Sequence, residues 1–214
     1  MRIARTFIYR MYKRSITNMK RYDIIRHLID KRGYKSYLEI GVLGNETFNN
    51  VPLDVKHGVD PNGCGTHSMT SDEFFANHCK QNYDIIFIDG LHLAEQVQKD
   101  IENSLTHLNN GGIIVVHDCL PSEEYEQRRE GVSGKPWTGD VWKAFASMRA
   151  RRADLMMCVV DTDYGCGLIQ KTNMSSGPIS CLPINGKLTW DWFQKYRNEL
   201  MNVITTEEFI GRTQ

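Results

Sequence analysis

Residues 37–47 read YLEIGVLGNET, a short apolar run that ends in a glycine-rich turn. Three later runs follow the same plan, and each ends in a polar residue: KHGVD at 56–60, YDIIFID at 83–89 and GIIVVH at 112–117. Short apolar runs of this kind are typical of strands that are buried on both faces, as in a parallel sheet. Residues 155–160 and 167–171 are predicted to form two further strands.

Helical patterns lie between these runs. One amphipathic helix is predicted by apolar residues that recur every three or four positions: Leu93, Val97, Ile101, Leu105 and Leu108. Helices are also predicted for residues 1–32, which Gly33 would end, for a short segment capped by Ser71 and Asp72, and for residues 140–151. Strands that alternate with helices predict the α/β class, with a doubly wound and mostly parallel sheet.

Charge is balanced overall, with 26 basic and 26 acidic residues, but it is uneven along the chain. Residues 1–35 hold 11 Lys and Arg against two Asp, so this leader carries nine net positive charges and the remainder nine net negative ones. Such a leader either contacts anionic lipid or nucleic acid, or complements the acidic body as a solvated helix face, and we favour the second interpretation. No apolar run approaches 18 residues, so no membrane-spanning helix is predicted.

The patterns divide the chain into three parts: a basic helical leader at 1–34, an α/β domain at 35–172 and a C-terminal extension at 173–214. The extension carries aromatic residues on a predicted helix: Trp190, Trp192, Phe193 and Tyr196. We expect it to pack on the domain or to form a dimer contact or a substrate wall, so a homo-oligomer stays open. The six cysteines include no C-x-x-C pair, which indicates scattered thiols in a reducing, cytoplasmic compartment.

Polar residues gather where the predicted strands end. Asp60 ends the second run, Asp89 and His92 follow the third, and His117 and Asp118 end the fourth. In a doubly wound sheet the ligand binds outside the carboxyl ends of the strands. We therefore expect these side chains to meet at one site.

The turn after the first run contains Gly41, Gly44 and Asn45. Glycine lets the backbone approach a ligand closely and adopts positive φ, and asparagine tolerates the left-handed conformation better than most residues. The turn is not the G-x-G-x-x-G dinucleotide motif. Asp60 lies about twenty residues beyond it, where an acid can bind both ribose hydroxyls, or it forms an Asx turn with the residues that follow.

His92 stands just before the helix predicted to begin near Leu93. The positive end of a helix dipole disfavours imidazolium, and a neutral imidazole near pH 7 is what a general base needs. We therefore favour His92 as a catalytic base over a loop histidine without a role.

Four motifs occur in a characteristic order: LEIGV at 38–42, GVDP at 58–61, FIDGLH at 87–92 and GGIIVVHD at 111–118. In that order they resemble a class I S-adenosylmethionine-dependent methyltransferase, and specifically the bacterial small-molecule branch that contains macrolide-sugar O-methyltransferases. The resemblance covers roughly residues 35–170. It implies a seven-stranded Rossmann-like methyltransferase sheet with N-terminal helices, in which residues 35–172 are the cofactor-binding catalytic domain.

The resemblance also implies a set of residues that bind S-adenosylmethionine: Glu39, Gly41, Leu43, Gly44 and Asn45 at the methionine end, Asp60 at the ribose, Ser71 and Asp72 beside the adenine, and Asp89. In the sugar-methylating relatives, acids at the positions of Asp89 and Asp118 bind magnesium, and the histidine at the position of His92 is the base. The relatives carry a further acid where this chain has His117. Magnesium prefers oxygen ligands, so metal dependence stays open here, with His117 as an additional candidate ligand.

The expected function is methyl transfer from S-adenosylmethionine to a hydroxyl of a small polar acceptor, such as a sugar or a glycan or natural-product precursor. The reaction would be an in-line displacement at the sulfonium methyl, for which the protein aligns the acceptor oxygen and excludes water. Two alternatives stay open. One is a non-catalytic, nucleoside-binding α/β module. The other is a nucleic-acid methyltransferase: the chain lacks an N/D-P-P-Y motif, which argues against methylation of amino groups but not against methylation of ribose or of a ring carbon.

Residues 120–138 form a long charged loop directly after Asp118. The loop is expected either to close over the site as a lid that selects the acceptor or to be a solvated surface insertion.

Overall fold

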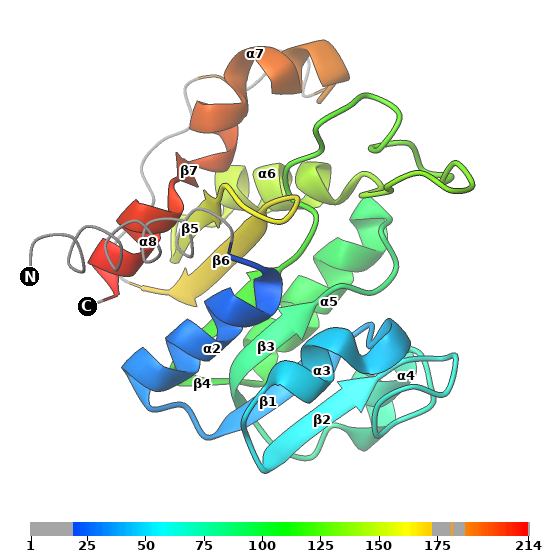
Figure 1. Ribbon diagram of the computed structural model, residues 1–214, viewed down its shortest axis with the longest axis vertical. Helices are drawn as coiled ribbons and strands as arrows, with labels where there is room; N and C mark the ends of the chain where they lie inside the picture. Colours follow the sequence, from blue (N-terminus) through cyan, green and yellow to red (C-terminus); the bar gives the residue numbers. More distant parts are fainter. Residues whose placement is uncertain (1–18, 173–180, 182–186, 214) are drawn as a thin grey trace, which may run out of the picture.

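The computed structural model describes residues 19–172, 181 and 187–213. Its centre is a seven-stranded sheet with the order β2-β1-β3-β4-β6-β5-β7 (Figure 1). The strands are β1 (Ser36–Ile40), β2 (Val55–Val59), β3 (Tyr83–Ile88), β4 (Leu108–Val116), β5 (Leu155–Val160), β6 (Cys166–Lys171) and β7 (Val203–Ile204). The first four are parallel to one another, and β6 is antiparallel to both β4 and β5.

Helices cover both faces of the sheet (Figure 1). One core layer joins it to α2 (Arg21–Arg32), α3 (Glu46–Asn50) and α8 (Thr206–Arg212). The other joins it to α5 (Ala94–Thr106), α6 (Val141–Arg151) and α7 (Trp190–Met201), and to Phe74 of a π-helix, Phe74–His78, that continues the short α4 (Ser71–Glu73). The doubly wound, mostly parallel sheet predicted from the sequence is confirmed.

The local signals act largely as predicted. Gly33 ends α2 in the left-handed conformation, with φ 65°. The amphipathic pattern from Leu93 onward becomes α5, whose apolar face is buried against the sheet. The predicted cap of α4 was wrong by one residue, because the hydroxyl of Thr70, rather than Ser71 or Asp72, accepts the Glu73 N–H.

The C-terminal residues that the structure describes complete the sheet and its cover. β7 pairs with β5 in parallel, and α7 packs on α6. The division of the chain into leader, domain and extension stays a prediction, and residues 1–18 of the leader lie outside the described residues.

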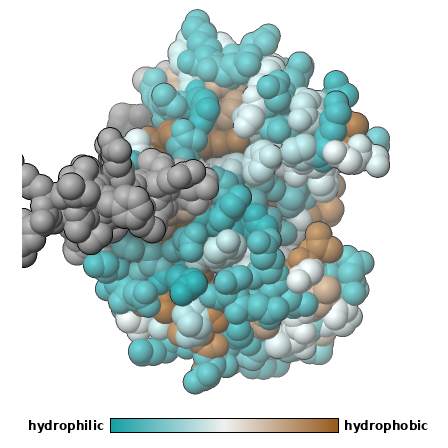
Figure 2. All heavy atoms as spheres, in the orientation of Figure 1, coloured by the Kyte–Doolittle hydropathy of each residue, from teal (hydrophilic) through white to brown (hydrophobic). Residues whose placement is uncertain are grey.

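Figure 2 shows a predominantly hydrophilic face on which hydrophobic residues are exposed only in small separate groups. No helix in the described ranges is long and apolar enough to cross a membrane. All six cysteines are free thiols, as their spacing predicted.

Candidate active site

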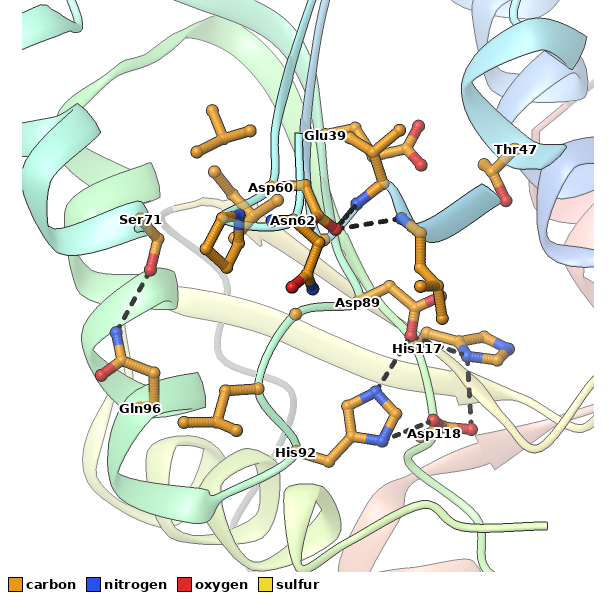
Figure 3. Close-up of a pocket in the computed structure, with 18 of the residues that line it drawn as sticks. Glu39, Thr47, Asp60, Asn62, Ser71, Asp89, His92, Gln96, His117 and Asp118 are labelled. Atoms are coloured by element: carbon orange, nitrogen blue, oxygen red, sulfur yellow. Dashed lines mark hydrogen bonds and ion pairs between the residues drawn. The ribbon is translucent and has the colours of Figure 1, made fainter. Parts of the chain in front are cut away.

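A cavity of about 740 Å³ opens where β1, β2, β3 and β4 end (Figure 3). Its volume is in the range of small-molecule sites. Ten residues singled out in the sequence line it: Glu39, Gly41, Leu43, Asp60, Ser71, Asp72, Asp89, His92, His117 and Asp118. Gly44 and Asn45 do not line it. The convergence expected from the strand ends is therefore present in the fold.

The glycine turn is shaped by contact between two strand ends. Gly41 has φ 86°, and a Cβ added there would lie 2.2 Å from the carbonyl oxygen of Asp89. Only glycine fits this position, because the obstructing atoms belong to the backbone. Gly44 and Asn45 have φ of 75° and 61°, so the left-handed conformation expected at both is confirmed.

Asp60 is 4% exposed and holds the glycine turn closed. Its Oδ2 accepts the N–H groups of Val42 at 3.0 Å and Leu43 at 3.1 Å, and its Oδ1 accepts the Asn62 N–H at 2.8 Å. The Asx-turn interpretation is thus present in the structure. Each carboxylate oxygen can accept more than one hydrogen bond, so this geometry is compatible with a ribose hydroxyl as an additional donor.

Glu39 lies at the end of β1 and is 1% exposed. The Tyr37 hydroxyl donates a hydrogen bond to its Oε2 at 2.5 Å. Burial raises the pKa of Glu39 to about 8, although the bond from Tyr37 opposes this shift. The carboxyl is therefore mainly protonated near pH 7, and a cation bound beside it would favour its ionised form.

Gln96 of α5 is a cavity residue that the sequence analysis missed. Its Nε2 donates to Ser71 Oγ at 3.3 Å (Figure 3). It also donates to Asp72 Oδ1 at 2.9 Å and to Asp100 Oδ1 at 3.2 Å. Burial raises the pKa of Asp100 to about 6. The available signal was the position of Gln96 in the first turn of a helix that follows a strand end.

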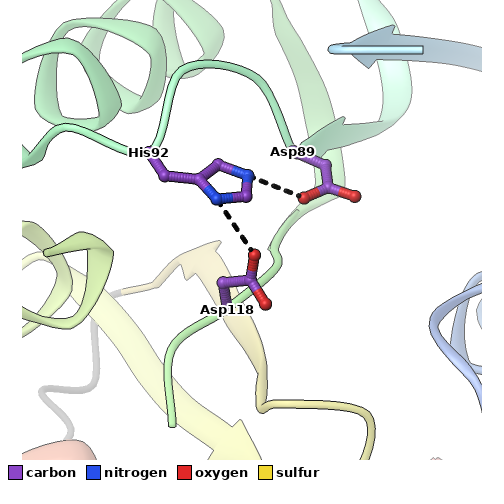
Figure 4. A group of neighbouring side chains, drawn as sticks. All are labelled: Asp89, His92 and Asp118. Carbon is purple, nitrogen blue, oxygen red and sulfur yellow. Dashed lines mark ion pairs between the residues drawn. The ribbon is translucent and has the colours of Figure 1, made fainter. Parts of the chain in front are cut away.

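Asp89, His92, His117 and Asp118 form one acid–histidine cluster. His92 Nε2 lies 3.4 Å from Asp89 Oδ1, and its Nδ1 lies 3.3 Å from Asp118 Oδ2, so the imidazole stands between the two carboxylates (Figure 4). His117 Nδ1 lies 3.2 Å from Asp89 Oδ1 and 3.2 Å from Asp118 Oδ1. His117 and Asp118 are each 5% exposed.

The charges of this cluster control its protonation. Burial alone would lower the pKa of both histidines, but the carboxylates of Asp89 and Asp118 outweigh this effect and raise both pKa values. The pKa of His117 is raised more than that of His92. Burial likewise opposes ionisation of Asp89, yet the charge and hydrogen bond of His117 hold the pKa of Asp89 well below its usual range.

The expectation that a helix dipole keeps His92 neutral is corrected by this arrangement. The helix begins at Ala94, and the main-chain N–H of Ala94 donates to Asp140 Oδ1 at 2.8 Å. Two carboxylates face the imidazole directly, and a charge in contact outweighs a partial charge at a helix end. The pKa of His92 is consequently raised rather than lowered.

Arg21, at the start of α2, also lines the cavity and was not predicted. Its Nε donates to Thr47 Oγ1 at 3.1 Å and lies 3.8 Å from Asp89 Oδ2, and its Nη1 lies 3.2 Å from Asp163 Oδ2. Asp163 and Tyr164 occupy the tip between β5 and β6 with φ of 45° and 60°. No sequence pattern indicated that this tip meets α2.

The loop at 120–138 contributes to one wall of the cavity through Pro136, Trp137 and Thr138. The Trp137 ring stacks on His92 with centroids 4.9 Å apart, and the Trp137 carbonyl oxygen lies 3.2 Å from His92 Nδ1. Since a carbonyl only accepts, Nδ1 carries the proton in this contact. Arg129 ties the loop to Glu95 and Asp140. Whether the loop also opens and closes stays a prediction.

Asp89, His92 and Asp118 each offer one ligand atom within 4.8 Å of the others, which is close enough to test for a metal site. Magnesium requires near-ideal octahedral geometry with oxygen ligands. Here one imidazole stands between the two carboxylates, and the Oδ1 atoms of both share a second imidazole nitrogen as neighbour. The donor set and its arrangement do not fit a magnesium ion.

Comparison with known proteins identifies a matching domain and similar folds. Residues 38–119 match the family model described as "Methyltransferase domain". The fold is similar to that of the O-methyltransferase TomG from Streptomyces achromogenes, involved in tomaymycin synthesis and solved in complex with SAM, with TM-score 0.53, 16% identity and coverage of 70% of this chain and 79% of that one. It is also similar to the SAH-bound Podospora anserina methyltransferase PaMTH1, with TM-score 0.53, 13% identity and coverage of 71% and 78%. No curated protein sequence matches the chain significantly.

Proposed function

We propose that the chain, whose residues 38–119 match a methyltransferase domain, is a class I methyltransferase that uses S-adenosylmethionine to methylate a hydroxyl of a small polar acceptor, with His92 as the base. The observation that supports this most directly is the His92 imidazole, which lines the cavity between two carboxylates at the end of β3. The sugar or glycan or natural-product class of the acceptor comes from the resemblance of the motifs.

The electrostatics of the cavity suit the cofactor that we propose. Its lining includes six acids, namely Glu39, Glu46, Asp60, Asp72, Asp89 and Asp118, against Arg21 and two histidines. S-adenosylmethionine carries a positive sulfonium and a positive ammonium group, so acids near it are favourable. In our proposal the ammonium lies toward Glu39, the ribose toward Asp60 and the adenine toward Ser71 and Asp72.

The reaction requires little covalent chemistry from the protein. When bound, S-adenosylmethionine would supply the methyl carbon to which the acceptor oxygen bonds, and S-adenosylhomocysteine would be the leaving group, keeping the electron pair of the broken carbon–sulfur bond. The hydroxyl proton passes to Nε2 of His92, while the Trp137 carbonyl and Asp118 hold Nδ1–H. A positive sulfonium bound beside the imidazole would oppose the rise in the pKa of His92 that the two carboxylates cause, and so would favour the neutral form that a base needs.

Two measurements test this proposal. Calorimetric titration of the whole chain with S-adenosylhomocysteine should give a micromolar Kd, and absence of binding would contradict the cofactor assignment. A panel of hydroxyl compounds, including sugars and phenols, is then incubated with S-adenosylmethionine, and formation of S-adenosylhomocysteine is measured.

The role of His92 is tested with the acceptor that this panel identifies. His92→Gln should lower kcat by about 10²–10⁴-fold, since general-base catalysis contributes that much, while the Kd for S-adenosylhomocysteine stays within about threefold. His78→Gln, an exposed histidine outside the cavity, is the matched control and should be as active as the wild type. A fully active His92→Gln variant would refute the base assignment.

A further inference from the structure

Three carboxylates from separate elements surround the imidazole of His117, and their side chains are largely shielded from solvent, with exposed fractions of 18% for Asp89, 7% for Asp118 and 4% for Asp163. Asp89 follows β3, Asp118 follows β4, and Asp163 lies in the turn between β5 and β6. His117 Nδ1 lies 3.2 Å from an oxygen of each of the first two, and its Nε2 lies 3.7 Å from Asp163 Oδ2. Buried carboxylates are stable only when positive groups or hydrogen-bond donors face them.

Arg21 provides a permanent positive charge to the same group of acids. Guanidinium is not deprotonated in proteins, and its planar donors match carboxylates well. Both the main-chain N–H and Nη1 of Arg21 bind Asp163 Oδ2, at 2.9 and 3.2 Å, and Nε lies 3.8 Å from Asp89 Oδ2. The Thr162 hydroxyl donates to the Met19 carbonyl, so the start of α2 is fastened to the turn between β5 and β6.

We propose that Arg21 and His117 take the place of a divalent cation between Asp89, Asp118 and Asp163, and that methyl transfer by this chain is independent of metal. A metal shared by Asp89 and Asp118 would need oxygens that converge on one point. The Oδ1 atoms of both converge instead on the ring nitrogen of His117. This inference rests on the proposed methyltransferase function and adds how its acids are neutralised.

In this arrangement Arg21 is a positioning residue that acts through Asp89. It holds Oδ2, and His117 holds Oδ1, so the carboxylate stays ionised and oriented toward Nε2 of His92. An ion pair at one oxygen and a hydrogen-bond contact at the other leave the carboxylate few alternative orientations.

The first test titrates the whole chain with Mn²⁺ alone and measures binding by calorimetry. The wild type should show no Mn²⁺ binding at about 1 mM, whereas His117→Asp should bind it, because the variant adds a hard oxygen ligand and removes the competing nitrogen. In His117→Asn the new side chain has the size of aspartate without its charge, and the affinity of this variant for Mn²⁺ should be at least about tenfold weaker than that of His117→Asp. Saturable Mn²⁺ binding by the wild type, or equal weak binding by both variants, would overturn the inference.

The titration with S-adenosylhomocysteine is repeated on each protein as a check of folding and of the cofactor site. If the wild type fails to bind S-adenosylhomocysteine, the proposed function fails. If it binds both S-adenosylhomocysteine and Mn²⁺, only the metal inference fails. The two failures are therefore distinguishable.

The second test measures turnover with the acceptor found in the panel. Activity of the wild type should survive EDTA. Arg21→Met should lower kcat at least about tenfold without changing the Kd for S-adenosylhomocysteine, and Arg21→Lys should restore part of it, because lysine keeps the charge but not the planar fork. Arg26→Met, on the exposed side of the same helix, is the control. Loss of activity in EDTA that Mg²⁺ restores, or an Arg21→Met variant as active as Arg26→Met, would overturn the inference.

Discussion

Replacing Gly41 with alanine is expected to force apart the two strand ends that form the floor of the site. A Cβ at this position would lie 2.2 Å from the Asp89 carbonyl oxygen, 2.4 Å from the Asp89 carbonyl carbon and 2.5 Å from the Gly90 Cα. All three atoms are backbone atoms, so no side chain can rotate away. Relief requires β1 and β3 to separate next to Asp89.

The expected magnitude has two parts. A residue other than glycine at φ 86° carries a left-handed penalty of about 1–2 kcal/mol. Overpacking against rigid surroundings adds about 1–3 kcal/mol, and occasionally more. Gly41→Ala should therefore reduce the free energy of unfolding by about 2–5 kcal/mol.

Gly44→Ala is a matched control in the same turn. Gly44 has φ 75°, but nothing lies within 4 Å of an added Cβ. This variant should therefore show only the backbone penalty of about 1–2 kcal/mol. The difference between the two variants isolates the steric contact with Asp89.

Urea unfolding followed by circular dichroism gives both free energies, and calorimetry with S-adenosylhomocysteine reports the site. We expect Gly41→Ala to be the less stable variant and to lose at least about tenfold in affinity, since Asp89 and the glycine turn move together. Equal stabilities for the two variants would refute the argument that the strand ends are in contact.

Three further outcomes are expected. Asp60→Asn should lower the free energy of unfolding by about 1–3 kcal/mol and weaken S-adenosylhomocysteine binding, because one of its oxygens would no longer accept backbone N–H groups; urea unfolding that matches the wild type would contradict this. The folded pKa of Asp100, about 6, lies above its unfolded value, so its contribution to stability falls as pH rises from about 4 to 6. Asp100→Asn should thus be more stable than the wild type by up to about 3 kcal/mol at pH 7 and equal to it near pH 3, and a pH series of urea titrations checks the sign. Trp137→Leu removes the ring stacked on His92 and should reduce turnover while leaving S-adenosylhomocysteine affinity unchanged, which steady-state kinetics and calorimetry together decide.

The elements that the sequence predicted are those with a repeating burial pattern. The run at 83–89 became β3 because both faces of that strand are covered, and the pattern from Leu93 became α5 because one helix face meets the sheet. β7 could not be predicted in this way. Val203 and Ile204 are too short a run to show a period, and they form a strand only because β5 offers them Val159 and Val160 as partners.

The site was predictable to the extent that it lies at strand ends. Asp89 and His117 end predicted strands, and His92 and Asp118 follow those strands within three residues, so the topology of a parallel sheet brings the four together. Arg21 follows no strand, and Asp163, its main partner, is 142 residues away along the chain. Pairing over that separation depends on how α2 crosses the sheet, which no local pattern contains.

Electrostatic magnitudes explain why the dipole argument for His92 failed. They also explain why the site residue that the sequence analysis did not predict, Arg21, is an arginine. The end of a helix contributes about 0.3–1 kcal/mol. Two unit charges 4 Å apart contribute about 4 kcal/mol at an effective dielectric constant of 20, so the carboxylates at 3.3 and 3.4 Å determine the direction of the pKa shift of His92.

The same reasoning applies to the acids themselves. Parallel strands place Asp89 and Asp118 at one edge of the sheet, where their mutual repulsion has to be offset by cations. The predicted set contained histidines but no permanent positive charge, and the fold provides that charge through Arg21 from α2, the basic helix at the start of the described chain.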